Sequence, residues 1–265
     1  MVGNKRQMEM IQFIKERINV TTQELMEQFN VSDMTIRRDL KKLEDDGHII
    51  KFHGGATIKE KDSSSPVSAE EFSNYDISTQ IRSASYIEEK RRIASKAVSM
   101  IEDGESILLD AGTTTFEIAK QLGEKKHLTV VTNGINIAHY LLGKPHINVI
   151  IPGGDMRPSS ESLVGPATVD FLSKLTVDQA FIGSAGISLE RGFSNSNMIE
   201  GSIKSTMIKI AAKSHIVADP SKFQHNTLYV YANFEDVTSI ITNKELDEKI
   251  KADIMNKGVV DLILS

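Results

Sequence analysis

The chain has 265 residues, 40% hydrophobic and 25% charged, with a formal net charge of −5, which predicts one small module and one larger one with a sizeable core. It has no cysteine and no histidine spacing typical of a metal site, which excludes thiol chemistry and predicts neither metal nor cofactor. No apolar run is long enough to cross a membrane and no signal-peptide pattern is present, so we expect a cytoplasmic protein without a membrane partner.

Three helical patterns open the chain. Apolar residues at helical spacing predict a first helix over residues 4–18 and a second over 21–29. Ser32 is a typical N-cap residue and begins a third helix that is rich in arginine and lysine. The apolar stripe that would pack this third helix on the first two consists of Ile36, Leu40 and Leu43.

A short hairpin follows the third helix. Gly47 ends the helix, and residues 48–51 and the segment after Gly54 and Gly55 predict two strands joined by a tight turn. Three helices followed by such a hairpin are typical of a winged helix-turn-helix, which binds DNA. We therefore assign residues 1–58 to a DNA-binding domain.

The distribution of charge agrees with this assignment. Acidic and basic residues balance up to residue 58, so the negative charge lies in the rest of the chain. The face of the third helix opposite its apolar stripe would enter a major groove, where arginine binds guanine and lysine binds phosphate. The wing would add contacts to the backbone or the minor groove. The candidate DNA-binding residues are Ser32, Asp33, Met34, Thr35, Arg37, Arg38, Lys41, Lys42, Lys51 and His53.

Two of these candidates have an equally good structural explanation. Met34 would be exposed on such a helix whether or not it contacts a base, and His53 fits a turn as well as a DNA contact. Arginine and lysine also occupy solvated helix faces in general, so the interpretation depends on the three helices and the wing occurring together.

The third helix and the wing carry a specific residue pattern. It consists of residues 31–40, VSDMTIRRDL, then Leu43, Gly47 and residues 53–56, HGGA. This pattern resembles the DeoR-type helix-turn-helix of bacterial sugar-catabolism regulators. Lys51 departs from it, since many members carry arginine there; the charge is kept but the planar fork of the guanidinium is lost.

The remaining residues predict a linker and a larger domain. Residues 59–76, KEKDSSSPVSAEEFSNYD, lack periodicity and predict a linker over 59–78, followed by a domain over 79–265. Helices are expected over 88–101, 114–122, 133–142, 166–175, 199–212 and 244–256, and strands over 106–110, 128–132, 147–151, 180–182, 215–218, 239–242 and 259–264. Repeated β-α units with apolar strands predict an α/β domain whose mainly parallel sheet is covered on both faces.

Polar loops follow several of these strands. Ligands of parallel sheets bind beyond the carboxyl ends of the strands, where residues 110–115, DAGTTT, offer a tight turn, hydroxyls and a helix N-terminus to an anion. Each loop also has an ordinary explanation as a cap, a turn or a helical ion pair. Together at one edge, with no P-loop or dinucleotide-binding pattern, they favour a small polyhydroxylated phosphate ester.

This larger domain also resembles the sensor domain of the DeoR family, which is similar in fold to ribose-5-phosphate isomerase and glucosamine-6-phosphate deaminase. The resemblance implies a phosphosugar effector surrounded by Asp110, Gly112, Thr113, Thr114, Thr115, Thr132, Asn133, Gly154, Arg157, Glu200, Lys204 and Lys222. A departure falls at residues 183–186, GSAG, where some relatives and the related enzymes carry an aspartate. We assign no catalytic residue.

These features predict a DNA-binding transcriptional repressor of a sugar or sugar-alcohol catabolic operon, controlled by a phosphorylated sugar. The alternative is a sugar-phosphate isomerase or deaminase with a regulatory DNA-binding module, in which Glu200 would be the base; the missing acid at 184–185 counts against it. Activation in place of repression depends on operator position and stays open. We expect a homo-oligomer, dimer or tetramer, because two half-sites give more specificity than one.

Overall fold

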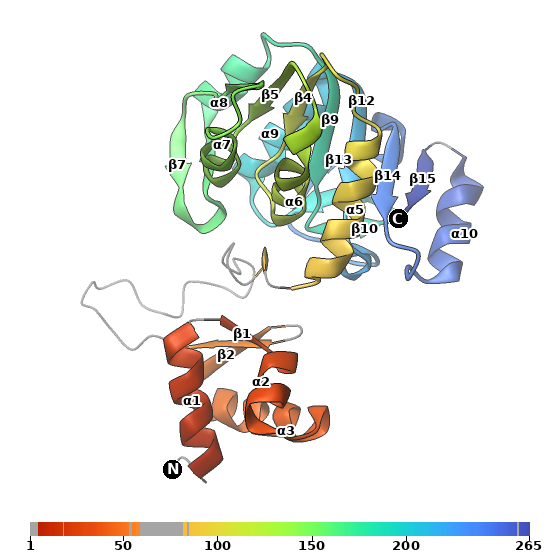
Figure 1. The fold of residues 1–265 in the computed structure, drawn as a ribbon. Helices are drawn as coiled ribbons and strands as arrows, with labels where there is room; N and C mark the ends of the chain where they lie inside the picture. Colours follow the sequence, from red (N-terminus) through yellow and green to blue (C-terminus); the bar gives the residue numbers. More distant parts are fainter. Residues whose placement is uncertain (1–4, 18, 53–54, 59–81, 84, 259) are drawn as a thin grey trace. The chain divides into compact units, whose positions relative to one another are not determined.

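The computed structural model describes residues 5–17, 19–52, 55–58, 82–83, 85–258 and 260–265 (Figure 1). Contacts within the chain divide it into two compact units, Met1–Ile87 and Glu88–Ser265. His53 and the expected linker, 59–78, lie outside the described residues.

Helices and a small sheet make up the described part of the N-terminal unit. The helices are α1 (Lys5–Arg17), α2 (Thr22–Phe29) and α3 (Asp33–Asp45), and the strands are β1 (Asn19–Thr21), β2 (Ile49–Phe52) and β3 (Gly55–Ile58). The strand order is β1-β3-β2, and both pairs are antiparallel. The sequence pattern does not predict β1, which pairs the buried Val20 with Ala56 of β3.

Helix α3 is fixed by its apolar stripe. Ile36, Leu40 and Leu43 are buried in one cluster with Met10 and Ile14 of α1. This packing orients the opposite face of α3 toward solvent, as the helical periodicity predicts.

A parallel sheet forms the centre of the larger unit (Figure 1). Its strands, in spatial order, are β15 (Asp261–Leu264), β14 (Ser239–Thr242), β12 (Ala211–Val217), β9 (Val177–Gly183), β4 (Ser106–Leu109), β5 (Leu128–Thr132) and β6 (Ile147–Ile150). Every neighbouring pair in this order is parallel. One face is covered by α5 (Ile87–Ser99), α6 (Thr113–Gln121) and α7 (Ile135–Leu141), and the other by α8 (Pro166–Leu172), α9 (Met198–Ile210) and α10 (Glu248–Lys257).

Successive residues of β4 pack on opposite faces of the sheet. Ile107 and Leu109 are buried in one cluster with Ile93 of α5, whereas Leu108 is buried in the other with Ile203 of α9. The predicted α/β fold, with a parallel sheet covered on both faces, is confirmed.

The strand order places a switch point beside β4. The chain passes from β4 outward through β5 and β6, and β9 then returns to the other side of β4. Asp110 follows β4 directly, and Gly183 ends β9. Ligands of open α/β sheets bind at the carboxyl ends of strands that flank such a switch point.

Short elements that the sequence pattern does not predict surround this sheet. Strand β7 (Asp155–Arg157) pairs with β8 (Ser162–Val164), and β11 (Gly192–Asn195) pairs with β10 (Gly186–Ser188) and β13 (Tyr229–Ala232). The short 3-10 helices are η1 (Leu122–Glu124), η2 (Pro158–Ser160), η3 (Pro220–Lys222) and η4 (Phe234–Asp236). Segments of three or four residues are too short for a periodic pattern to be detected.

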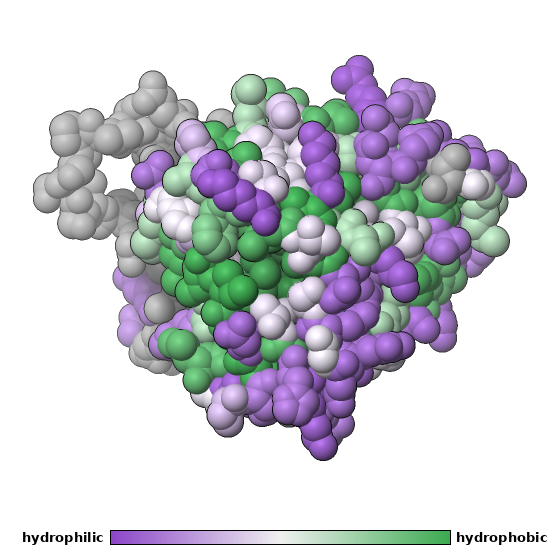
Figure 2. Space-filling view, turned by 90° about the horizontal axis from the view of Figure 1, so that it is seen from above, coloured by the Kyte–Doolittle hydropathy of each residue, from purple (hydrophilic) through white to green (hydrophobic). Residues whose placement is uncertain are grey.

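Some large hydrophobic side chains of the larger unit remain on its surface. They are Leu142, Ile151, Met156, Phe171, Met198, Ile199, Leu228, Val230 and Met255. Figure 2 shows hydrophobic residues gathered in the middle of one face, with hydrophilic residues around them. A contiguous apolar area is typical of a surface that another chain covers. Within the described residues, each helix is too short or too polar to span a membrane.

Candidate functional site

The candidate DNA-binding residues lie largely on the outer face of α3. Met34 is 81% exposed, and Arg38, Lys41 and Lys42 are exposed on the same helix. None of these three cations forms an ion pair within the described residues. They are therefore available to phosphates and base edges.

Side-chain contacts organise the first turns of α3. Ser32 is the N-cap residue, and its hydroxyl lies 3.0 Å from that of Thr35 instead of accepting from a backbone amide. Arg37 Nε donates to Asp33 Oδ2 at 2.7 Å, one helical turn away. The two contacts hold most of the polar side chains at the start of this helix.

Charged contacts also tie β2 and α1 to α3. The backbone amide of Lys51 donates to Glu44 Oε1 at 3.0 Å, and its Nζ lies 3.9 Å from Oε2. The buried carboxylate of Asp39 accepts from Arg6 Nε at 2.8 Å and from Gln7 Nε2 at 2.9 Å. Sequence reasoning gives Asp39 no role, because its partners lie 33 and 32 residues away.

We expect Asp39→Ala to lower the free energy of unfolding of the N-terminal unit by about 2 kcal/mol, because it removes the acceptor for Arg6 and Gln7. Urea unfolding measures this loss, and DNA binding should weaken because α3 loses its polar contacts with α1 while the apolar packing remains. Asp45→Ala removes an exposed acid from the same helix and should change stability by less than about 0.5 kcal/mol. Equal stability of the two variants would contradict the structural role of Asp39.

A buried ion pair lies at the switch point of the larger unit. Lys204 of α9, 6% exposed, donates from Nζ to Asp110 Oδ2, which is 3% exposed, and to Gly183 O at 3.0 Å. Gly183 N donates to the same carboxylate oxygen at 3.0 Å, and the Tyr231 hydroxyl donates to Gly183 O at 3.1 Å. Burial raises the pKa of Asp110 against the opposing charge of Lys204, and it raises the pKa of Tyr231.

Glu200 lies one turn before Lys204 in α9. Asn195 Nδ2 donates to Glu200 Oε2 at 2.8 Å, and Arg157 Nε lies 3.1 Å from Oε1. Oε1 is buried and faces the Arg157 guanidinium. Burial opposes ionisation of Glu200, but the Ser160 hydroxyl, the Asn195 amide and the charges of Lys204 and Arg157 outweigh it and lower the pKa. Glu200 is therefore ionised at neutral pH.

The turn between β4 and α6 is closed by Thr115. Its hydroxyl lies within hydrogen-bond distance of Asp110 O, at 2.5 Å, and of Gly112 O, at 2.9 Å. Gly112 is the N-cap residue of α6, and Thr113 and Thr114 are its first, buried residues. The first amides of a helix have no intrahelical acceptor, so this turn can offer N–H groups to an anion.

Thr132 and Asn133, after β5, fix the neighbouring loops. Asn133 Oδ1 accepts from Ala111 N at 3.0 Å, and its Nδ2 donates to Leu163 O at 3.1 Å. Thr132 Oγ1 accepts from Gly134 N at 3.0 Å. Both side chains form hydrogen bonds with backbone groups, so they hold the loops at this edge of the sheet in place.

Gly154 and Lys222 occupy two further loops. Gly154 has a φ of +146°, and a Cβ there would lie 2.1 Å from Thr168 Oγ1, so only glycine fits. Lys222 ends η3, which Asp219 caps by accepting from Ser221 N at 3.0 Å. Lys222 is half-buried, and no carboxylate pairs with it in the described part of the chain.

Residues 183–186 form a turn that supplies no acid. Ser184 Oγ donates to Gly186 O at 2.8 Å and lies 3.3 Å from Ser194 O. A Cβ on Gly186 would lie 2.7 Å from His225 O, so the chain passes too closely for a side chain. The serine hydroxyl therefore holds this turn.

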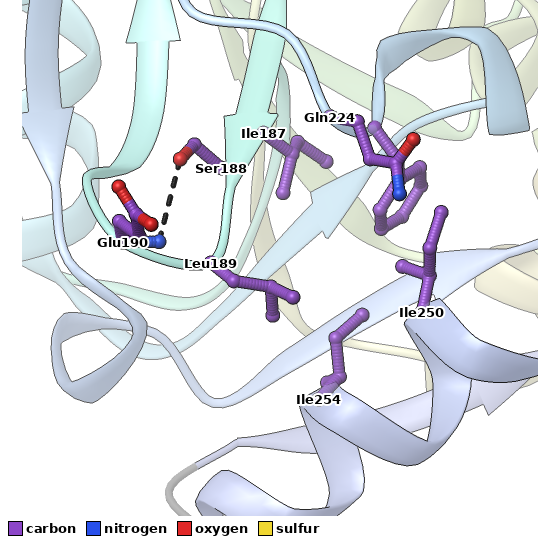
Figure 3. Close-up of a pocket in the computed structure, with 8 residues that line it drawn as sticks. Ile187, Ser188, Leu189, Glu190, Gln224, Ile250 and Ile254 are labelled. Carbon is purple, nitrogen blue, oxygen red and sulfur yellow. Dashed lines mark hydrogen bonds between the residues drawn. The ribbon is translucent and has the colours of Figure 1, made fainter.

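A separate cavity of 170 Å³ lies beside η3 (Figure 3). Its lining residues are Ile187, Ser188, Leu189, Glu190, Phe223, Gln224, Ile250 and Ile254. Figure 3 shows the aliphatic side chains of α10 on one side and Glu190 near Ser188, whose Oγ accepts from Glu190 N at 3.3 Å. This lining offers no cation, so it does not suit a phosphate ester.

Comparisons with known proteins match both parts of the chain. Residues 6–62 match the model of the DeoR-like helix-turn-helix domain, and residues 85–244 match that of the DeoR C terminal sensor domain. The chain belongs to the DeoR family.

Several curated members of the DeoR family align over most of their length. The HTH-type transcriptional regulator IolR of Bacillus subtilis (strain 168) is 35% identical over 91% of this chain and 91% of its own. The putative aga operon transcriptional repressor of Escherichia coli O157:H7 is 33% identical, over 98% and 93%. The glycerol-3-phosphate regulon repressor of Escherichia coli (strain K12) is 31% identical, over 88% of each. The predicted function of this DeoR-family chain as a DNA-binding transcriptional regulator is confirmed.

Solved structures show a more distant likeness. A D-ribose-5-phosphate isomerase in complex with phospho-erythronic acid is 18% identical, with a TM-score of 0.39 over 52% of this chain and 54% of that chain. The delta subunit of eIF2B from Chaetomium thermophilum is 18% identical, with a TM-score of 0.42 over 59% and 56%. The DeoR-family chain spans about half the length of these solved structures.

Proposed function

We propose that this chain represses a sugar or sugar-alcohol catabolic operon and leaves its operator when a phosphorylated sugar or sugar alcohol binds the larger unit. The relatives named above as an aga operon repressor and a glycerol-3-phosphate regulon repressor support this proposal. So does a lactose phosphotransferase system repressor of Staphylococcus epidermidis, 32% identical over 92% of this chain and 93% of its own.

The observation that carries the effector proposal is the charge arrangement at the carboxyl edge of the sheet. The ion pairs Arg157–Glu200 and Lys204–Asp110 are each neutral overall. Lys222 adds a cation that has no carboxylate partner among the described residues. A phosphosugar offers hydroxyl donors for the buried Glu200 Oε1 and an anion for Lys222 and the first amides of α6.

Each proposed effector residue then has one of two roles. Residues that contact the effector are Glu200, Arg157, Lys222, Gly112, Thr113 and Thr114. Residues that hold these in place are Asp110, Lys204, Thr115, Thr132, Asn133 and Gly154. The effector releases DNA only if it binds one arrangement of the protein more tightly, and a difference of about 1–3 kcal/mol lowers operator affinity about 5- to 150-fold.

The contacts of the carboxylates favour binding over catalysis. The lowered pKa of Glu200 makes it a weak base, and the buried Asp110 is already bonded to Lys204 and Gly183. The turn at Ser184 supplies no second acid. Incubation of the pure protein with a panel of sugar phosphates should therefore give no product, and turnover would support the isomerase or deaminase alternative.

Lys222→Ala should leave operator binding unchanged and raise the effector concentration needed for release by about tenfold, because the anion loses a charged partner. Fluorescence anisotropy of a labelled operator during effector titration measures this change. Lys209→Ala removes an exposed lysine of α9 and serves as the control. An unchanged effector response would remove Lys222 from the proposed site.

Arg38→Ala should weaken operator binding by about 1–3 kcal/mol with little change in the thermal midpoint, because Arg38 is exposed and unpaired among the described residues. Arg191→Ala removes an exposed arginine from the larger unit and should leave binding unaltered. A marked fall in the midpoint would show that Arg38 has a structural role instead.

We also propose that the protein acts as a homo-oligomer, a dimer or a tetramer. One α3 reads a short half-site, and two copies spaced by a helical turn of DNA read a longer operator. The apolar area visible in Figure 2 supports association of the larger units. Analytical ultracentrifugation distinguishes the two assemblies, and a monomer at micromolar concentration would contradict the proposal.

A further inference from the structure

Asp33 and Arg37 form an exposed ion pair at the start of α3. Arg37 Nε lies 2.7 Å from Asp33 Oδ2, and the two side chains are 70% and 47% exposed. An exposed pair at this spacing contributes little to stability. A carboxylate on a helix that faces DNA also repels the phosphate backbone. An acid in the first turn also favours the helix N-terminus, but that effect does not require a contact with Arg37.

The pair determines which edge of the Arg37 guanidinium remains available. A guanidinium carries five N–H donors in a planar fork, and Asp33 occupies the one on Nε. The two terminal amino groups are left to present a pair of parallel N–H bonds. This pair matches the O6 and N7 acceptors of guanine in the major groove.

Holding the side chain also reduces the disorder that DNA binding would otherwise have to remove. A long arginine side chain loses rotamer freedom when it is fixed at an interface, and a side chain already oriented loses less. The neighbouring Arg38 is exposed and has no such partner within the described residues. The two arginines are therefore suited to different tasks.

We propose that Asp33 is a positioning residue for sequence readout, which holds Arg37 so that its terminal amino groups bind O6 and N7 of one guanine in each half-site. This inference rests on the proposed DNA-binding face of α3. Asp33 then has two effects: its charge lowers affinity for DNA in general, and its contact with Arg37 raises discrimination between sequences.

The test compares two duplexes, one enriched from a random-sequence library by the unaltered protein and one with its bases shuffled. Asp33→Asn removes the charge at nearly constant size. We expect its affinity for the shuffled duplex to rise, and the ratio of affinities for enriched over shuffled DNA to fall about three- to tenfold. Asp33→Ser, also compatible with a helix N-terminus, should behave in the same way.

Asp45→Asn is the matched control, because Asp45 is an exposed acid on the same helix. It removes the same charge without touching Arg37, so it should raise both affinities and leave their ratio unchanged. Thermal midpoints of all variants separate these effects from unfolding.

Base-pair substitutions in the enriched duplex distinguish a positioning role of Asp33 from a general electrostatic effect of its charge. Arg37→Ala should abolish the preference for guanine at one base pair, and Asp33→Asn should weaken the preference at that same base pair. Adding Asp33→Asn to Arg37→Ala should not change the ratio further.

An unchanged ratio in Asp33→Asn, or a weakened preference at a different base pair, would overturn the inference while leaving the proposed function intact. A library that yields no enriched duplex with the unaltered protein would overturn both, because α3 would then read no sequence.

Discussion

Lys204→Met should lower the free energy of unfolding of the larger unit by about 3–5 kcal/mol, because it leaves the carboxylate of Asp110 buried without its cation. Among the residues that the structure describes, only Gly183 N would remain as a charge-stabilising donor to that carboxylate oxygen. Urea unfolding of the variant and the unaltered protein at pH 7 measures the loss.

The pH dependence of this variant supports the same interpretation. Burial raises the pKa of Asp110, and Lys204 opposes this rise, so the pKa rises further in Lys204→Met. A carboxyl whose folded pKa is above its unfolded value destabilises the fold as the pH rises through the folded pKa. The loss in Lys204→Met should therefore shrink as the pH is lowered toward the unfolded pKa of 3.8.

Two controls make the result specific. Asp110→Asn combined with Lys204→Met removes both charges and should recover most of the lost stability. Lys174→Met breaks an ion pair with Asp170 in which both side chains are 69% exposed, and it should change stability by less than about 1 kcal/mol. If Lys204→Met and Lys174→Met lower the free energy of unfolding equally, the buried pair does not stabilise this edge of the sheet.

Acidification from pH 7 to pH 5 should destabilise the larger unit by about 2 kcal/mol through His215 alone. His215 Nδ1 lies 2.8 Å from Ser239 Oγ, its Nε2 lies 3.1 Å from Gln179 Oε1, and its ring stacks on Phe181 at 5.1 Å. Burial, with a smaller effect of Lys213, lowers the pKa of His215 from 6.5 to about 4. The folded state therefore holds the neutral ring while the unfolded chain gains a proton.

The sign of this effect follows from the lowered pKa. The stability that the neutral His215 contributes is fully present above pH 6.5, which is its pKa in the unfolded chain. It is lost as the pH falls toward about 4, the pKa in the folded state. Glu200 and Asp178 also have lowered pKa values, but their contributions are lost only below 4.5 and 3.8. Asp110, whose pKa is raised by burial, contributes with the opposite sign, so comparison with His215→Gln is what isolates the contribution of His215 between pH 7 and pH 5.

Urea unfolding monitored by tyrosine fluorescence at both pH values tests this prediction. His215→Gln should have a lower free energy of unfolding than the unaltered protein at pH 7, but that free energy should fall much less on acidification. His139→Gln alters an exposed histidine, so its free energy of unfolding should fall on acidification as much as that of the unaltered protein. Identical pH slopes for His215→Gln and the unaltered protein would show that another group controls the acid response.

Much of the fold could be predicted because its signals are local. The stripe of Ile36, Leu40 and Leu43 defines α3 by helical spacing, and Ile107 to Leu109 form an apolar run that is typical of a strand buried on both faces. Strands β7, β8, β10 and β11 have three or four residues each, and their pairing depends on tertiary contacts that no short pattern records.

The candidate site could be predicted only in outline. Asp110 follows a strand, and Glu200 and Lys204 lie one turn apart on a helix, so their positions have local signals. Their partners do not: Lys204 contacts Asp110 across 94 residues, and Glu200 contacts Arg157 of an unpredicted strand. Asn195, which holds Glu200, lies in another such strand.

The most direct test of the account is operator release by a phosphorylated sugar. A labelled duplex enriched by the protein is followed by fluorescence anisotropy while sugars and their phosphates are added in matched pairs. We expect at least one phosphorylated sugar or sugar alcohol to release the duplex at concentrations at which its unphosphorylated form does not. Release by both forms alike, or by no phosphate in the panel, would contradict it.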